Sequence, residues 1–288
     1  VLIQFPIISD PRGNLTFIES NNHIPFTIQR VFWIYDVPGG ETRGGHAYTT
    51  NEEIIIALSG SFDVITSEND ETTRHTLNRS YSGMYVPPLT WRHLENFSTN
   101  ALALIISSNF FSEEDYIREK KLISSERKKI SNTKQKTFIQ SKVNQVKLDS
   151  KKTTIEDCNS INIGVIHKEK GNITVLENLK NIPFKIERIY YLYDVPGGEE
   201  RGGHAHKKLR QFIVAAMGSF DVIIDDGQSK KTIQLNRSFN CLEIVPGIWR
   251  ELVNFSSGSI CLVMASHSYD ETDYFRNYSH YQKYKSDD

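Results

Sequence analysis

The chain carries two copies of one sequence pattern, and this repeat restricts its fold more than any other feature. The run YDVPGGETRGGHAY at residues 35–48 is matched at twelve of fourteen positions by YDVPGGEERGGHAH at residues 193–206. The same offset of 158 residues relates four further segments of the first copy to the second: residues 60–65, 77–80, 91–92 and 96–98. Two copies are too few for a solenoid, so each copy should fold around its own core.

Each copy has the pattern of an all-β domain. Short apolar or alternating runs are separated by Gly, Pro, Asn and Asp at intervals typical of a sandwich or barrel. A chain of 288 residues has room for two such domains. We therefore predict two tandem antiparallel β jelly rolls, at residues 1–120 and 158–288, with a polar, partly helical linker at residues 121–157.

Local signals add turns and helices to this prediction. Asp225, Asp226 and Gly227 predict a hairpin turn in the second copy. The segments that begin at Ser112 and at Asp270 predict a short helix at the end of each copy, with Ser112 as an N-terminal cap.

Composition excludes several partners and locations. There are 11 Lys and Arg between residues 120 and 152, which suits a basic arm for nucleic acid, but Phe138 is the one aromatic there available for stacking. A solvated linker is favoured, and the formal net charge of -1 indicates neither a nucleic-acid nor a membrane partner. Three cysteines without a CxxC pair predict reduced thiols, and no apolar run has membrane-spanning length. These features favour a cytoplasmic protein.

The most chemically suggestive residues are a pair of histidines in the second copy. His204 and His206 are two apart, so in a strand both imidazoles point to one side. Arg201 precedes them, and Gly202 and Gly203 let the backbone bend to deliver this fixed cation. A base that titrates near neutrality beside a permanent charge suits proton transfer. Surface or purely structural histidines are the alternative.

The spacing around these histidines resembles the first motif of the cupin fold. Gly198, His204, His206, Gln211 and Gly218 fit that motif. Within cupins, RGGHAHK, with YDVPGG before it and GSFDV after it, resembles the sugar-nucleotide 3,4-ketoisomerases of deoxysugar biosynthesis. The resemblance covers both repeats almost end to end.

The resemblance implies an isomerase that needs no cofactor and acts on dTDP-4-keto-6-deoxyglucose. Such an enzyme removes the C3 proton, forms an enediolate and reprotonates C4, which gives a dTDP-3-keto-6-deoxyhexose for later transamination. The product would serve the synthesis of lipopolysaccharide or another glycan. No net oxidation occurs, and the chain has no GxGxxG motif for a nicotinamide cofactor. Whether the product has the galacto or the gluco configuration at C4 is left open.

The resemblance also implies roles for individual residues. His206 would be the general base, with His204 as its partner in handling hydroxyl protons. Tyr193 and Arg201 would orient the sugar and stabilise the developing oxyanion.

Three further residues are expected to bind substrate. Arg188 would lie near the phosphates or the sugar, with a structural salt bridge as the alternative. Trp249 could stack on the thymine base, although packing is the more common fate of such a residue. Gln211 occupies the position at which most cupins have a glutamate.

The first copy departs from the second where the chemistry requires a base. Tyr48 stands in the place of His206, while Tyr35, Arg43 and His46 are kept. A phenol with an ordinary pKa near ~10 is a poor base at neutral pH beside an imidazole near ~6.5. We therefore predict that the second copy is active and that the site of the first is impaired.

Neither copy holds the full metal set of the cupins, which is His-x-His, a Glu and a later His. The second copy has Gln211 and Glu251 at the last two positions. The first has Glu53 and His93 there but loses a histidine to Tyr48. We therefore expect no metal and no other cofactor.

Two other functions and two assemblies stay open. A deoxysugar 3,5-epimerase also uses a His base, which it pairs with a buried Asp and a Tyr acid; the HAHK context argues against it. A non-catalytic sugar-nucleotide-binding cupin is the second alternative. Ketoisomerases of this type are generally homodimers with strand exchange, so the fused copies could form a pseudodimer within one chain or a homodimer.

Overall fold

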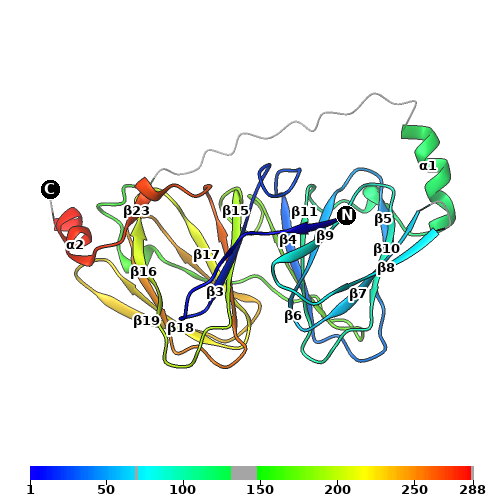
Figure 1. The fold of residues 1–288 in the computed structure, drawn as a ribbon. Helices are drawn as coiled ribbons and strands as arrows, with labels where there is room; N and C mark the ends of the chain where they lie inside the picture. The colour runs from blue at the N-terminus through cyan, green and yellow to red at the C-terminus, as the bar shows by residue number, and fades with distance from the viewer. Residues whose placement is uncertain (69–70, 131–147, 287–288) are drawn as a thin grey trace. The chain divides into compact units, whose positions relative to one another are not determined.

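A computed structural model describes residues 1–68, 71–130 and 148–286, which form two compact β units. Each unit contains two antiparallel sheets (Figure 1). The expected all-β class, with two jelly-roll domains, is confirmed. Within the described residues, no helix is long and apolar enough to cross a membrane.

The first unit has a six-stranded and a five-stranded sheet. In sheet order, the larger one consists of β1 (Leu2–Gln4), β9 (Ser82–Val86), β6 (Glu53–Ser59), β11 (Leu102–Ser107), β4 (Arg30–Tyr35) and β14 (Asn172–Glu177). The smaller one consists of β12 (Tyr116–Ile117), β5 (Arg43–Tyr48), β10 (Trp91–Glu95), β7 (Phe62–Glu68) and β8 (Glu71–Leu77).

The second unit repeats this arrangement with one more edge strand. Its larger sheet consists of β13 (Ser160–Asn162), β20 (Asn240–Ile244), β17 (Gln211–Met217), β22 (Ile260–Ala265), β15 (Arg188–Tyr193), β3 (Asn14–Glu19) and β2 (Ile7–Ile8). Its smaller sheet consists of β19 (Lys230–Leu235), β18 (Phe220–Asp225), β21 (Trp249–Val253), β16 (Arg201–His206) and β23 (Tyr274–Phe275).

An apolar core lies within each unit and draws on both of its sheets. In the second unit, Ile213 and Val263 of the larger sheet join Val222 and Leu252 of the smaller one, all at 0–1% exposure. Burial of each such side chain is worth about 1.5–3 kcal/mol. This core fixes the face of each strand and therefore the direction of the polar residues that alternate with it.

One strand near the start of each repeat pairs within the unit built mainly from the other repeat. In the second unit β3 lies against β15 (Figure 1). In this register Ile18 is opposite Ile189, and Ile18 is fully buried. In the first unit β14 lies against β4 in the matching register. The units therefore differ from the contiguous ranges expected, 1–120 and 158–288, because residues 5–25 belong to the second and 165–180 to the first. Pairing registers of this kind are not visible in a single sequence.

The helices begin later than predicted. The segment from Ser112 forms only a short 3-10 helix and then strand β12, and Ser112 makes no side-chain cap. The segment from Asp270 does the same before β23, although Asp270 accepts a hydrogen bond from Thr272 N–H. Pairing of β12 with β5 and of β23 with β16 takes precedence over helical propensity here. The helical elements are η1 (Glu113–Asp115), η2 (Lys120–Leu122), α1 (Ile123–Ile130), η3 (Ile155–Asp157), η4 (Glu271–Asp273) and α2 (Tyr278–Ser286).

Two other local predictions can be compared with the structure. The hairpin at residues 225–227 is confirmed, because β18 and β19 pair directly on either side of it. Cys158, Cys241 and Cys261 are all free thiols, as expected. Residues 131–147 of the predicted linker lie outside the described residues.

Candidate functional site

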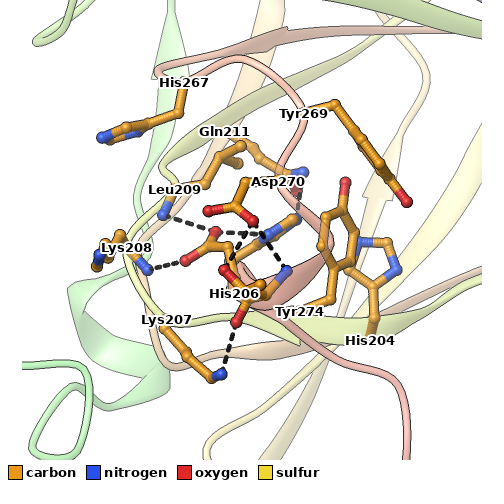
Figure 2. A network of polar contacts seen from close by, with 12 residues as sticks. His204, His206, Lys207, Lys208, Leu209, Gln211, His267, Tyr269, Asp270 and Tyr274 are labelled. Carbon is orange, nitrogen blue, oxygen red and sulfur yellow. Dashed lines mark hydrogen bonds and ion pairs between the residues drawn. The ribbon is translucent and has the colours of Figure 1, made fainter.

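Strand β16 places the two histidines of the second unit side by side. The ring centroids of His204 and His206 are 4.9 Å apart at an interplanar angle of 89°. Ala205 between them is buried against Trp249 and Tyr281. The alternation expected from their spacing is therefore present, and Figure 2 shows both imidazoles beside the ring of Tyr274.

His206 is almost fully buried, at 4% exposure, in polar surroundings. Its Nδ1 lies 3.1 Å from Asp273 Oδ2, and its Nε2 lies 3.1 Å from Gln211 Nε2. A carboxylate can only accept and an amide nitrogen can only donate. The ring is therefore protonated at Nδ1, and its Nε2 lone pair accepts from Gln211.

The orientation of Gln211 is fixed independently. Its Oε1 accepts from Arg250 Nε at 3.1 Å, so its amide nitrogen must face the other way. That nitrogen also donates to Tyr190 Oη at 3.0 Å, which uses its second hydrogen. Gln211 thus connects His206 with Arg250 and defines the histidine tautomer.

Burial keeps both histidines neutral. It lowers the pKa of His206 to about 4, although the hydrogen bond that His206 donates to Asp273 opposes the shift. It lowers the pKa of His204 well below the ordinary value, and the charge of Arg250 adds to the effect. Burial raises the pKa of Asp273, but hydrogen bonds from His206 and from the Lys208 and Leu209 amides outweigh it, so the pKa lies below its usual range. The pair at neutral pH is a neutral imidazole and a carboxylate.

The pH dependence of activity should reflect this burial. A base acts when unprotonated, and the folded-state pKa of His206, about 4, lies below the ordinary value near ~6.5. We expect kcat/KM to stay level from neutral pH down to about pH 5 and to fall as the pH drops through about 4. Initial rates measured in overlapping buffers would test this. An acid limb near pH 6.5 would show that His206 is not buried as the structure has it.

Arg250 organises the other side of the site. It is 3% exposed, donates to Tyr190 Oη at 3.0 Å and lies 3.4 Å from His204 Nδ1. It also donates to the Gly202 carbonyl. Because Nδ1 of His204 accepts this contact, the His204 proton is on Nε2, which is buried and has no partner among the residues that the structure describes. An N–H donor is thereby left available at the site.

Gly202 should be irreplaceable while its neighbour is not. Its φ is +78°, and an added Cβ would lie 2.1 Å from Arg250 Nη1. Gly202→Ala should lower the free energy of unfolding by about 1–3 kcal/mol and reduce activity, since backbone strain and displacement of Arg250 combine. Gly203→Ala is the matched control, because its Cβ would meet Trp249 at an ordinary 3.6 Å. Urea unfolding of both variants would test this, and equal losses would contradict it.

Sequence reasoning missed Asp273 and Tyr274. The Tyr274 ring lies 4.3 Å from that of His206 and 4.9 Å from that of His204, and its hydroxyl accepts from Arg188 Nη2 at 3.3 Å. A usable signal was present, because Asp115 and Tyr116 occupy the matching positions of the first copy. The expectation of a helix there concealed their proximity to β16.

Tyr193 and Arg201 occupy a different part of the unit from the histidine pair. Tyr193 Oη lies 3.1 Å from Thr16 Oγ1, on the face of β15 opposite to Arg188 and Tyr190. Arg201 donates to the Gly13 carbonyl at 2.6 Å and lies 3.7 Å from Asp10. Both contact the N-terminal segment that belongs to this unit. In the described chain, no hydrogen bond or ring contact joins either residue to His206.

Trp249 is packed rather than presented to a ligand. It is 5% exposed, and its ring contacts Tyr278 and Tyr281 of α2. Its Nε1 donates to Glu251 at 2.9 Å. This is the packing alternative raised from the sequence.

The first unit contains a different set of contacts at the same positions. Tyr48 donates to the Tyr116 hydroxyl at 3.2 Å. Where Gln211 joins His206 to Arg250, Glu53 instead forms a buried ion pair with Arg92 at 2.6 Å. Burial raises the pKa of the Tyr48 phenol and lowers the pKa of His46. Tyr48 is therefore a neutral phenol at any ordinary pH and cannot act as a base.

The described parts of both units contain no group of three or more His, Cys, Asp or Glu side chains suited to hold a metal ion. In the second unit, the side chains nearest His206 are already engaged with one another through hydrogen bonds.

Comparison with known proteins finds relatives that each cover slightly less than half of the chain. A curated relative, the TDP-4-oxo-6-deoxy-alpha-D-glucose-3,4-oxoisomerase of Aneurinibacillus thermoaerophilus, is 45% identical over 124 residues, which are 43% of this chain and 89% of the relative. A solved 3,4-ketoisomerase from Helicobacter canadensis is 41% identical over 46% of this chain and 98% of its own, with a TM-score of 0.45. The sugar 3,4-ketoisomerase QdtA from Thermoanaerobacterium thermosaccharolyticum, solved in complex with TDP, is 36% identical over 45% and 95%, with a TM-score of 0.44.

The family model described as FdtA: WxcM-like, C-terminal matches residues 1–144 and 156–286. These ranges include both repeats almost completely. The chain therefore belongs to the FdtA, WxcM-like C-terminal family and carries two consecutive copies of its unit.

Proposed function

We propose that the chain is a sugar-nucleotide 3,4-ketoisomerase whose active site lies in the second unit. It converts dTDP-4-keto-6-deoxyglucose to a dTDP-3-keto-6-deoxyhexose without a cofactor. Family membership and the named activity of a relative at 45% identity support the reaction class. The observation that carries the assignment of the site is the buried, neutral His206 between Asp273 and Gln211.

His206 is placed to move a proton between adjacent carbons. Its Nε2 lone pair takes the C3 proton, which the neighbouring C4 carbonyl has made acidic, as the bound sugar displaces the Gln211 amide. The imidazolium that forms keeps its Nδ1–H on the Asp273 carboxylate, which stabilises the new charge. After this proton exchanges with solvent, His206 delivers a solvent-derived proton to C4 of the enediolate, which completes the carbon part of the shift.

The oxygen protons must also change places, since O3 begins as a hydroxyl and O4 ends as one. Within the described part of the second unit, His204 Nε2–H and Arg188 Nε–H are buried donors without partners, and they suit the oxyanions of the enediolate. His204 gives its proton to O4 and recovers one from O3. No electrons leave the substrate.

The test is incubation with dTDP-4-keto-6-deoxyglucose in D₂O. Ketoisomerisation gives a 3-keto product with deuterium at C4, which NMR detects directly. Unchanged substrate in an intact, folded preparation would instead indicate the non-catalytic binding alternative.

One observation favours a second candidate, the 3,5-epimerase. A histidine on a buried carboxylate, Asp273, with a tyrosine ring 4.3 Å away, is the arrangement that an epimerase uses. The family and the curated relative favour ketoisomerisation. The same D₂O experiment separates the two, because epimerisation exchanges the protons at C3 and C5 and leaves the ketone at C4.

The strand pairing makes an intrachain pseudodimer our preferred assembly. Strands β3 and β14 each complete the unit of the other repeat within one chain. We expect sedimentation velocity to give a single species near the chain mass of 33.1 kDa. A dimer that persists at nanomolar concentration would contradict this.

The three free thiols support a cytoplasmic location.

A further inference from the structure

The two units leave the same pair of polar atoms buried and unsatisfied. Among the described residues, six side-chain nitrogen or oxygen atoms are buried without a partner, and four of them form two matched pairs. Arg188 Nε and His204 Nε2 are the pair in the second unit, and Arg30 Nε and His46 Nε2 are the pair in the first. An unsatisfied buried polar atom costs about 1–3 kcal/mol. Its repetition at both positions indicates that each unit reserves these atoms for a ligand.

The side chains that carry these atoms in the first unit are themselves deeply buried. Arg30 is 3% exposed and His46 is 7% exposed. The Arg30 guanidinium lies over the rings of Phe32 and Phe111 and makes one long hydrogen bond, from Nη2 to Ser107 Oγ at 3.5 Å, while its Nε has no hydrogen-bond partner among the described residues. Although Tyr48 stands where the second unit has its base, the neighbouring positions 30 and 46 are therefore still polar and not apolar.

The first unit also holds a cation, Arg43, whose counterpart in the second unit, Arg201, is engaged by neighbouring oxygen atoms. Arg201 of the second unit bonds to the Gly13 carbonyl and faces Asp10. In the first unit, Arg43 is 7% exposed, and no hydrogen bond or ion pair engages its guanidinium within the described chain. Glu41 acts on the Arg43 guanidinium through its charge but is itself paired with Lys170 at 3.1 Å. A buried guanidinium without a hydrogen-bonded carboxylate favours an anionic ligand.

The segments that precede β3 and β14 add to this difference between the surroundings of Arg43 and those of Arg201. Gly13 and Gly171 end equivalent tight turns. The backbone N–H of Gly13 donates to the Asp10 carbonyl and that of Gly171 to the Lys168 carbonyl, each at 2.9 Å. The position of the carboxylate that faces Arg201 is thus a lysine in the first unit. The first unit therefore lacks the carboxylate that lies near Arg201 in the second unit.

We propose that the first unit is a second binding site for a nucleoside-diphosphate sugar, which it holds without turnover. Arg43 meets the diphosphate, and Arg30 and His46 meet oxygen atoms of the ligand. The buried ion pair of Glu53 with Arg92, and the phenol of Tyr48, leave the bound sugar without a base. The choice of ligand class rests on the function proposed for the second unit.

Calorimetric titration of the full chain with thymidine diphosphate tests the proposal. We expect two molecules bound per chain in the wild type. Arg43→Gln should weaken one site at least tenfold and leave the other unchanged. One molecule bound per chain in the wild type, or an unchanged count in a folded Arg43→Gln protein, would overturn the proposal.

Fluorine labelling of the tryptophans tests the proposal independently, without a substitution in the site. Trp33 and Trp91 belong to the first unit and Trp249 to the second, so 5-fluorotryptophan reports on the units separately. Thymidine diphosphate should shift fluorine signals of both units. Shifts confined to Trp249 in a chain that turns over substrate would refute the second site and leave the proposed function intact. Absence of both binding and turnover would instead refute the proposed function.

Discussion

Replacing His206 with asparagine should lower kcat/KM for dTDP-4-keto-6-deoxyglucose by about 10²–10⁴-fold, the range expected for a positioned general base. Asparagine is smaller than imidazole and can still donate to Asp273, so the buried network keeps a polar partner. It cannot accept a proton from carbon. The D₂O assay on purified variant, read as deuterium at C4 over time, measures the loss directly.

The control is Tyr48→Phe in the first unit, at the position that matches His206. Its hydroxyl bonds only to Tyr116 among the described residues, and a neutral phenol is no base. Most activity should remain. Equal losses in the two variants would contradict the assignment of turnover to the second unit.

The repeat was enough to predict the fold class because strand signals and turn residues recur at a fixed offset. Alternation also placed His204 and His206 on one face, since side chains in a strand follow a period of two. Neither signal contains the pairing of β3 with β15, which depends on contacts about 170 residues apart. The contiguous boundaries expected from the sequence therefore differ from the compact units.

The site was only partly predictable for a similar reason. His206, His204 and Gln211 stand close together in the sequence, and their meeting follows from one turn between β16 and β17. Asp273 reaches His206 through the pairing of β23 with β16, which a helix prediction for that segment hid. Arg250 was visible as part of a repeated Trp-Arg pair, but its bond to Gln211 requires the three-dimensional structure.

Asp273→Asn should reduce kcat by about 10²–10³-fold with little change in KM. In a histidine–aspartate pair of a serine protease, the same substitution costs ~10⁴-fold because the wrong tautomer is stabilised. We expect a smaller loss here because Gln211 also orients His206. The imidazolium formed during turnover would lose its carboxylate, which is an effect on the transition state rather than on sugar binding.

The pH profile separates this role from a purely structural one. The hydrogen bond and charge of Asp273 raise the pKa of His206 against the effect of burial. Their removal should lower that pKa further, so the acid limb of the residual activity should move below pH 4. Asp115→Asn is the matched control, since Asp115 accepts from the Thr50 and Asn51 amides as Asp273 does from those of Lys208 and Leu209. Asp115→Asn should weaken the loop as Asp273→Asn does, but Asp115 lies beside no histidine base, so turnover should persist. If both variants lost activity equally, with no shift of the acid limb, Asp273 would be a support for the loop and not the partner of the base.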